Sequence, residues 1–323
     1  MSVSSISLNQ IVVMFIIILI GFICYKIKLI DSETNKQLSN LLLMLVNPLV
    51  IFISYQREFT KELLHGLLIS LLLAAVTHAV AIFVSYVLLR KRSLFFKGKN
   101  SDLTDEDPAN PDVAIERFSA IYSNCGFMGI PLVSGVYGSE GVFYLTAYMT
   151  IFNILIWTHG IVMIAGKQDK KTTIKMLMSP TIFATVLGFV LFIIQIQFPA
   201  AVLEAFTYVA GINTPLAMLV AGVTIGQTQI AKAFAKFRVY YTTLIKLLII
   251  PLLLLLLYSR FSIDKPILIT AVLAAACPAA ATGTLFALRF DKNALYASEL
   301  FAITTIFSLG SIPFLMAIAE LLT

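Results

Sequence analysis

Two short segments of this chain combine helix-breaking residues with side chains that can hydrogen-bond an anion. The first covers residues 123–131, with the sequence SNCGFMGIP, and the second covers residues 277–284, with CPAAATGT. Proline removes a backbone donor and opens a helix, so N–H groups at such a break become free to bind a ligand. The half-helix that follows also presents a positive dipole end. Asn124, Thr282 and Thr284 add amide and hydroxyl groups, and the combination favours a carboxylate or another small anion.

The composition places both segments in a membrane protein. The chain has 323 residues, of which 59% are hydrophobic and only 12% are charged, and its mean hydropathy is +0.94. A soluble domain carries about twice that fraction of charged residues, because it must cover itself with polar side chains. The net charge of +6 therefore indicates orientation in the bilayer and contact with anionic lipid, and no nucleic-acid partner is expected.

Apolar runs long enough to cross a bilayer, roughly 20 residues each, recur along the whole chain. The sequence predicts ten transmembrane helices, at residues 8–29, 36–55, 64–89, 117–138, 141–165, 174–196, 200–227, 239–259, 267–288 and 294–320. The fourth, seventh and ninth runs are interrupted by glycine and proline. The expected fold class is thus an all-α polytopic membrane protein.

The distribution of basic residues between the loops predicts the orientation. If the N-terminus lies outside, 18 of the 23 Lys and Arg residues fall in loops on the inner side, four fall in loops on the outer side, and Lys246 falls within a span. Inner loops of membrane proteins carry such an excess. We therefore expect a multi-pass protein of the plasma membrane with both termini outside. The longest inner loop, residues 90–116, has no function that its sequence reveals.

Ten spans divide into two groups of five, and five is odd, so two related halves must be inverted relative to each other. The expected repeats are residues 1–165 and 174–323, joined by a cytoplasmic linker at 166–173. The second span of each half has an asparagine before a proline, Asn47 and Asn213, and the fourth span of each half carries one of the two breaks. Counting about 1.5 Å per residue from the inner surface, residues 124–131 lie roughly 10–21 Å deep, across the midplane. Interrupted helices at matching positions of inverted halves point to a transporter binding site.

Polar residues inside the membrane are costly and tend to be functional. The candidates for substrate binding are Asn124, Cys125, Gly126, Pro131, Pro278, Thr282, Thr284, Asn47, Asn213 and Asn153. For several of them a structural interpretation stays open. Asn124 could cap the opened helix, the two threonines could bond to their own helix, and the asparagines beside prolines could satisfy carbonyls that those prolines leave free.

Three further residues are candidates for coupling transport to an ion. Glu299 begins the tenth span, where it could titrate or simply pair with Arg289 or Lys292. Lys246 could balance the charge of an anion, although a lysine several residues inside a span more often extends its side chain to the surface. His78 could relay a proton or be a hydrogen-bonded interior histidine.

Four stretches resemble the auxin efflux carrier family, which includes plant auxin exporters and bacterial malonate and malate carriers. They are residues 124–131 continuing to Tyr137-Gly138; residues 214–219 continuing to Gly222 and Gly226; residues 152–157; and residues 277–287. The resemblance extends over the whole chain apart from its loops. It implies a carrier for a small organic anion with no cofactor.

The resemblance also implies an architecture. Spans one, two, six and seven would form a scaffold that often assembles as a homodimer, and spans three to five and eight to ten would form a domain that moves like an elevator. The broken helices, spans four and nine, would cross at Pro131 and Pro278, with Asn124 as a substrate ligand. Where carriers of this kind often place asparagine a few residues after the second proline, this chain has Thr282.

Other functions are less consistent with the sequence. A membrane-embedded enzyme needs a nucleophile with its base or a metal motif, and neither pattern occurs, so no enzymatic activity and no metal are expected. A nucleotide-driven pump would need a phosphate-binding loop, which is also absent. A sodium-coupled symporter of the bile-acid type shares the architecture, and a sensor that binds without transporting is the remaining alternative.

Overall fold

The computed structural model describes residues 3–90, 112–166, 179–228 and 233–322. Every regular element in these ranges is a helix, and the β-type pairing found there is one isolated antiparallel bridge between Ser123 and Ala279. The all-α prediction is therefore confirmed for the part of the chain that is described. Most of the loop at 90–116 and of the linker at 166–173 lies outside the described residues.

The helices fall into two series along the chain. The first comprises α1 (Val3–Lys26), α2 (Ser32–Leu41), η1 (Leu42–Val46), α3 (Asn47–Ser54), α4 (Lys61–Leu88), α5 (Val113–Ile121), η2 (Cys125–Gly129), α6 (Ile130–Leu155), η3 (Ile156–Gly160) and α7 (Ile161–Ala165). The second comprises α9 (Pro180–Ile193), α10 (Ala200–Gly211), α11 (Asn213–Gln227), α13 (Phe237–Leu244), η4 (Ile245–Ile249), α14 (Ile250–Tyr258), α15 (Lys265–Ala276), α16 (Thr282–Arg289) and α17 (Ala294–Leu322). The η elements are short π-helical stretches; η1, η3 and η4 lie inside longer helices, and η2 begins the helix that α6 continues.

Seven helical runs in the described residues are long and apolar enough to cross a bilayer. They are Val3–Lys26, Ser32–Ser54, Lys61–Leu88, Cys125–Ala165, Ala200–Gln227, Phe237–Tyr258 and Ala294–Leu322, and α9 and α15 are shorter apolar helices. The run Cys125–Ala165 has 41 residues, more than a single crossing needs. It bends at Gly138, whose φ of 61° and ψ of −147° are not helical. Glycine adopts this left-handed backbone conformation without the steric penalty of a side chain.

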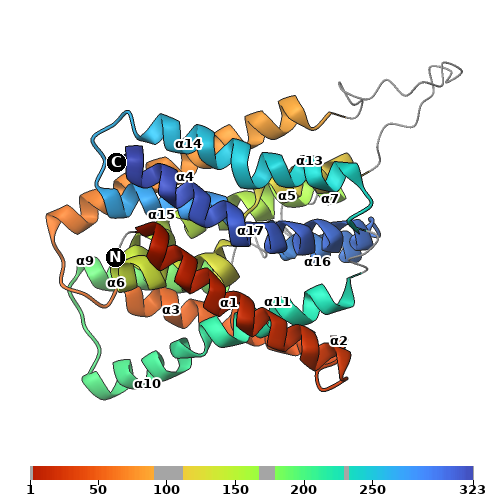
Figure 1. Ribbon diagram of the computed structural model, residues 1–323. Coiled ribbons are helices and arrows are strands. Elements are labelled where there is room, and N and C mark those ends of the chain that lie inside the picture. Colours follow the sequence, from red (N-terminus) through yellow and green to blue (C-terminus); the bar gives the residue numbers. More distant parts are fainter. Residues whose placement is uncertain (1–2, 91–111, 167–178, 229–232, 323) are drawn as a thin grey trace, which may run out of the picture.

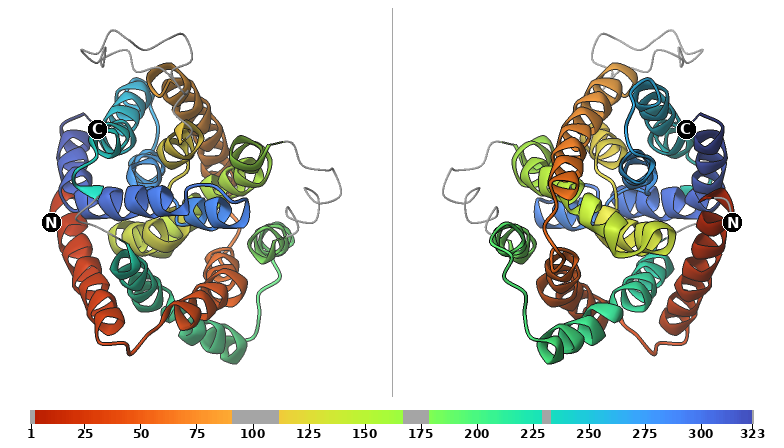
Figure 2. Two further views of the ribbon diagram at one scale, coloured as in Figure 1. Left: turned by 90° about the vertical axis from the view of Figure 1, so that its right-hand side faces the viewer. Right: turned by 90° about the vertical axis from the view of Figure 1, so that its left-hand side faces the viewer.

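The helices form two groups when the molecule is viewed along its length (Figure 2). In these end-on views α1, α3, α10 and α11 lie on one side and α4, α5, α14 and α15 lie on the other. The two chain ends lie at the same end of the molecule (Figure 1). There the backbone N–H of Ser4 donates to Glu320 Oε1 at 3.0 Å and so ties the start of α1 to the end of α17.

Glycines allow α1 and α11 to pack closely. A Cβ on Gly222 would lie 2.0 Å from the carbonyl oxygen of Ile18, and one on Gly21 would lie 2.3 Å from that of Leu219. Small residues at helix contacts let backbones approach in this way in membrane proteins. The two helices therefore form a tight pair on one side of the site.

Candidate functional site

The two broken segments meet and bond to each other through their backbones. The N–H of Asn124 donates to the carbonyl of Pro278 at 2.8 Å, and the N–H of Ala280 donates to the carbonyl of Tyr122 at 2.9 Å. The hydroxyl of Thr304, on α17, accepts the N–H of Ala279 at 3.1 Å. Because these groups belong to neither helix's own ladder, the crossing satisfies backbone that each break has opened, as a membrane interior requires.

Asn124 stands where η2 begins. Its carbonyl accepts from the N–H groups of Met128 at 2.9 Å and Gly129 at 3.2 Å. Its side chain makes no capping bond to the helix, and Nδ2 has no hydrogen-bond partner among the described residues although Asn124 is only 6% exposed. The capping interpretation of Asn124 is therefore wrong, and a buried amide donor remains free.

The crossing forms one wall of a cavity of about 560 Å³. The cavity extends from the two breaks to the polar first turns of α2. Its lining residues are Ser32, Glu33, Asn35, Lys36, Ser39, Asn40, Leu43, Asn47, Ser123, Asn124, Gly126, Phe127, Met149, Phe152, Asn153, Thr181, Val220, Thr224, Gln227, Ala280, Ala281, Thr282, Thr284, Leu285 and Leu288. A cavity of this size accommodates a small organic molecule.

Six of the ten predicted binding residues line this cavity: Asn47, Asn124, Gly126, Asn153, Thr282 and Thr284. In the part of the chain that the structure describes, the hydroxyls of Thr282 and Thr284 have no hydrogen-bond partner, so the alternative of a bond back to their own helix is not observed. Asn153 instead donates from Nδ2 to the carbonyl of Met149 at 2.7 Å, on its own helix.

The other four predicted residues lie outside this cavity. Cys125 is fully buried, and both Cys125 and Cys277 lie close to Gly129, where a Cβ would be 3.3 Å from Cys125 Cβ and 3.6 Å from Cys277 Sγ. The Pro278 carbonyl is used in the crossing, and the Pro131 carbonyl accepts from Gln10 Nε2 at 3.2 Å. Asn213 bonds to Asn47 and lines a second, smaller cavity. The prolines therefore shape the site and do not line it.

Lys246 does not extend to the surface, contrary to the expectation for a lysine at that depth. It is 1% exposed, and its Nζ donates to Ser123 Oγ at 2.5 Å. Ser123 in turn donates to the carbonyl of Ala275 at 3.2 Å and lines the cavity. The physical reason is that Lys246 lies in η4 on the inward face of its helix, directly behind the crossing. No carboxylate in the described residues forms an ion pair with it.

The other two coupling candidates lie apart from the cavity lining. Glu299 is fully buried and pairs with Lys236, not with Arg289 or Lys292, because α13 packs against α17 at this level. His78 is also fully buried, and its Nδ1 lies 2.8 Å from the carbonyl of Ala74.

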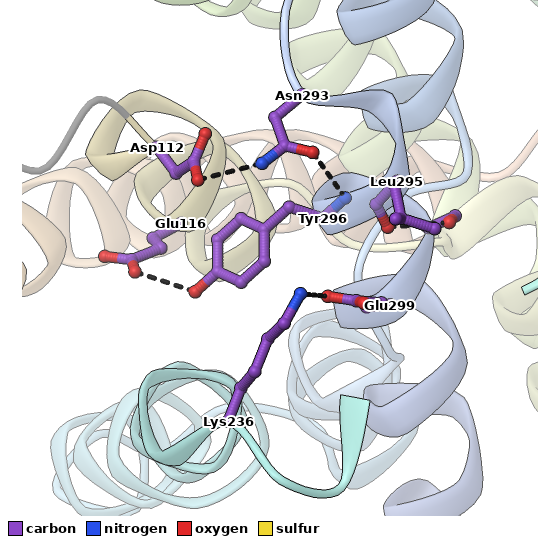
Figure 3. Close-up of polar contacts among 8 residues, drawn as sticks. Asp112, Glu116, Lys236, Asn293, Leu295, Tyr296 and Glu299 are labelled. Carbon is purple, nitrogen blue, oxygen red and sulfur yellow. Dashed lines mark hydrogen bonds and ion pairs between the residues drawn. The ribbon is translucent and has the colours of Figure 1, made fainter. Parts of the chain in front are cut away.

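Sequence reasoning missed a charged cluster that joins α5, α13 and α17. Figure 3 shows its contacts between α5 and the start of α17, Glu116 with Tyr296 and Asp112 with Asn293. The buried carboxylate of Glu116 accepts two bonds from Arg238 and one from the hydroxyl of Tyr296 at 2.8 Å. Asn293 donates to Asp112 at 3.0 Å beside it. Opposite charges near the ends of three expected spans were the available signal, but nothing in the sequence says which of these spans are neighbours.

Sequence comparison gives a family for this architecture. A model described as "Membrane transport protein" matches residues 6–175 and 167–316. The two matches divide the chain near its middle, which is consistent with two repeats.

Several transporters are similar over nearly the whole chain. A Methanothermobacter thermautotrophicus protein described as an uncharacterized transporter is 24% identical over 314 residues, covering 95% of this chain and 96% of its own length. The uncharacterized transporter YfdV of Escherichia coli K12 is 24% identical over 286 residues, covering 85% and 86%. The uncharacterized transporter MJ1031 of Methanocaldococcus jannaschii is 22% identical over 314 residues, covering 94% and 96%.

The family-model matches together span residues 6–316, which include both broken segments and the lining of both cavities. A helical, multi-pass membrane protein with a cavity beside its two breaks agrees with what these relatives are called. The chain belongs to the membrane transport protein family of auxin efflux carriers.

Proposed function

We propose that this protein is a secondary carrier that moves a small organic anion across the plasma membrane. The substrate is a mono- or dicarboxylate, similar in size to auxin, malonate or malate. It binds where the two broken helices cross, with Asn124, Thr282 and Thr284 as hydrogen-bond donors.

One observation carries this proposal: Lys246 is buried behind the crossing, and no carboxylate in the described residues forms an ion pair with it. The ammonium of Lys246 contacts the cavity wall through Ser123. A buried charge is costly when nothing balances it. A carboxylate in the cavity would balance it and would also bond to the free Asn124 amide and the two free threonine hydroxyls.

The same proposal includes ten spans in two inverted repeats, residues 1–165 and 174–323. The bend at Gly138 would divide the longest apolar run into spans four and five, and α15 with α16 would form the broken span nine. Spans one, two, six and seven would be the scaffold, and the rest would move relative to it. The grouping of helices in the end-on views supports this division.

The larger cavity lies toward the inner side in this topology. Its lining includes the first turns of α2, which follow an expected inner loop. With both termini outside, the described conformation would thus face the cytoplasm. An elevator movement of the crossing would then expose the site to the other side. A homodimer formed through the scaffold is part of the same proposal.

A sodium-coupled symporter is the alternative within carriers. Lys246 argues against a sodium ion bound directly behind the crossing, because a fixed ammonium repels a second cation nearby. A sensor that binds without transporting is the other alternative, and the uptake experiment described next distinguishes it from a carrier.

The test is uptake by purified protein in liposomes. A panel of labelled mono- and dicarboxylates is supplied under imposed pH, sodium and voltage gradients, with protein-free liposomes as the control. We expect saturable uptake of at least one carboxylate without added sodium. Uptake that requires sodium would favour the symporter, and binding without any uptake would favour the sensor. If the protein neither binds nor takes up any carboxylate of the panel, the proposal is contradicted.

A further inference from the structure

Two asparagines from matching positions of the two halves bond to each other in the interior. Asn47 is the first residue of α3 and Asn213 is the first residue of α11, and each precedes a proline by one or two positions. Asn213 Nδ2 donates to Asn47 Oδ1. The side chains are 2% and 3% exposed, so the pair is shielded from solvent.

This amide pair lies between two cavities. Asn47 lines the larger cavity, of about 560 Å³, and Asn213 lines a smaller cavity, of about 250 Å³. The smaller cavity is lined by parts of α3, α6, α10 and α11; its lining includes Ser54, Ile130, Ser134, Ser139, Thr207 and Thr214. Neither asparagine lines both cavities, so the hydrogen bond between them spans the partition.

The tip of the first break completes the partition from the opposite side. A Cβ on Gly126 would lie 3.4 Å from Asn47 Nδ2 and 3.7 Å from Met149 Cε. Met128 and Ile130, which follow in the same segment, are 0% and 3% exposed. The partition therefore consists of two amides on one side and the glycine-rich tip of the break on the other.

We propose that the Asn47–Asn213 pair is the fixed half of the barrier that separates the two sides of the membrane. This inference rests on the proposed carrier function, because it assigns the pair to the static part and the break to the moving part. Asn213 Nδ2 and Asn47 Oδ1 bond to each other when no substrate is present, and this bond keeps the partition closed. The tip of the first break would move past this asparagine pair. Gly126 has no side chain to obstruct that movement, and the unpartnered Oδ1 of Asn213 keeps the surface that the tip passes polar.

The experiment measures a passive leak and not carrier transport. The double variant Asn47→Ala/Asn213→Ala is made in an Asn124→Ala background and reconstituted in liposomes, and nitrate flux is driven by a potassium diffusion potential. The volume-filling control is Asn47→Leu/Asn213→Leu in the same background. Gel filtration of each variant confirms that it is inserted and folded.

We expect the alanine pair to raise nitrate flux about tenfold over the Asn124→Ala parent, since pore width and polar lining set such barriers. The leucine pair should stay as tight as the parent. An alanine pair that is equally tight overturns the proposal. A leak in both pairs also overturns it, because filling the space would then make no difference.

The outcome is separable from the proposed function. Nitrate needs no recognition by the site, and the Asn124→Ala background is expected to carry no organic substrate. If the wild-type protein fails to take up any carboxylate while the alanine pair leaks nitrate, the carrier assignment fails and the barrier remains. If the wild type takes up a carboxylate and the alanine pair does not leak nitrate, the carrier assignment holds and the barrier proposal fails.

Discussion

At the scale of single residues, the site is defined by groups that lack partners. The Asn124 amide nitrogen and the hydroxyls of Thr282 and Thr284 have no hydrogen-bond partner, yet they line the cavity. Buried polar groups without partners are costly and are usually explained by water, an ion or a ligand. Lys246 adds a charge behind this set and contacts the cavity wall through Ser123. We propose an anionic substrate because a carboxylate in the cavity would bond to the three free donors and balance that charge.

Replacing Lys246 by methionine tests the role of that charge. Methionine keeps the length and apolar character of the side chain but removes the ammonium. We expect the ratio of carboxylate uptake to uptake of the corresponding neutral amide to fall about tenfold or more, which is about 1.4 kcal/mol of discrimination. Competition assays in liposomes measure this ratio.

The control for this prediction is Lys265→Met, which removes the same charge at an exposed position on α15. It should leave the ratio unchanged. If Lys246→Met discriminates against the neutral amide as well as the wild type does, the ammonium takes no part in charge selection.

At the scale of helices, close packing and half-buried ion pairs hold the two sides of the site. α1 and α11 approach through glycines, and α5, α13 and α17 are joined by Glu116, Arg238 and Tyr296. Breaking a buried pair by removing one partner is more harmful than replacing both. The charged cluster therefore keeps three helices together near the breaks without entering the cavity.

Gly222→Ala should weaken the α1–α11 contact. The added Cβ would lie 2.0 Å from the Ile18 backbone oxygen, so α1 must move. Overpacking of this kind costs about 1–3 kcal/mol, and we expect a lower melting temperature in detergent. Gly310→Ala is the matched control, because a Cβ there meets nothing within 4 Å. Equal melting temperatures for the two variants would contradict the packing argument.

Helix breaks were predictable from sequence, but the contacts between helices were not. Proline and glycine mark where a helix opens. This local chemistry located both breaks and, within them, the polar residues Asn124, Thr282 and Thr284. Lys246 was misplaced because a sequence gives the depth of a residue but not which face of its helix points inward. Glu116 and Arg238 are 122 residues apart, and only the packing of α5 against α13 brings them together.

At the scale of the whole molecule, two cavities of different size lie on opposite sides of one partition. The crossing of the broken helices forms one wall of the larger cavity, and Asn213 lines the smaller cavity. A carrier must never open both sides at once, and a structure with one accessible binding site and a closed partition suits alternating access. In the proposed topology, two halves of opposite orientation would provide equivalent breaks and equivalent asparagines, and the molecule would present the same site to either side.

The most direct test of the central claim is equilibrium binding of labelled carboxylates to purified protein. The wild type is compared with Asn124→Ala and with Asn9→Ala, an asparagine that is exposed on α1. The account predicts saturable binding to the wild type and to Asn9→Ala, and a loss of about tenfold or more in affinity for Asn124→Ala, since each tenfold change is about 1.4 kcal/mol. Equal affinity of all three proteins would contradict a binding site at the crossing of the broken helices.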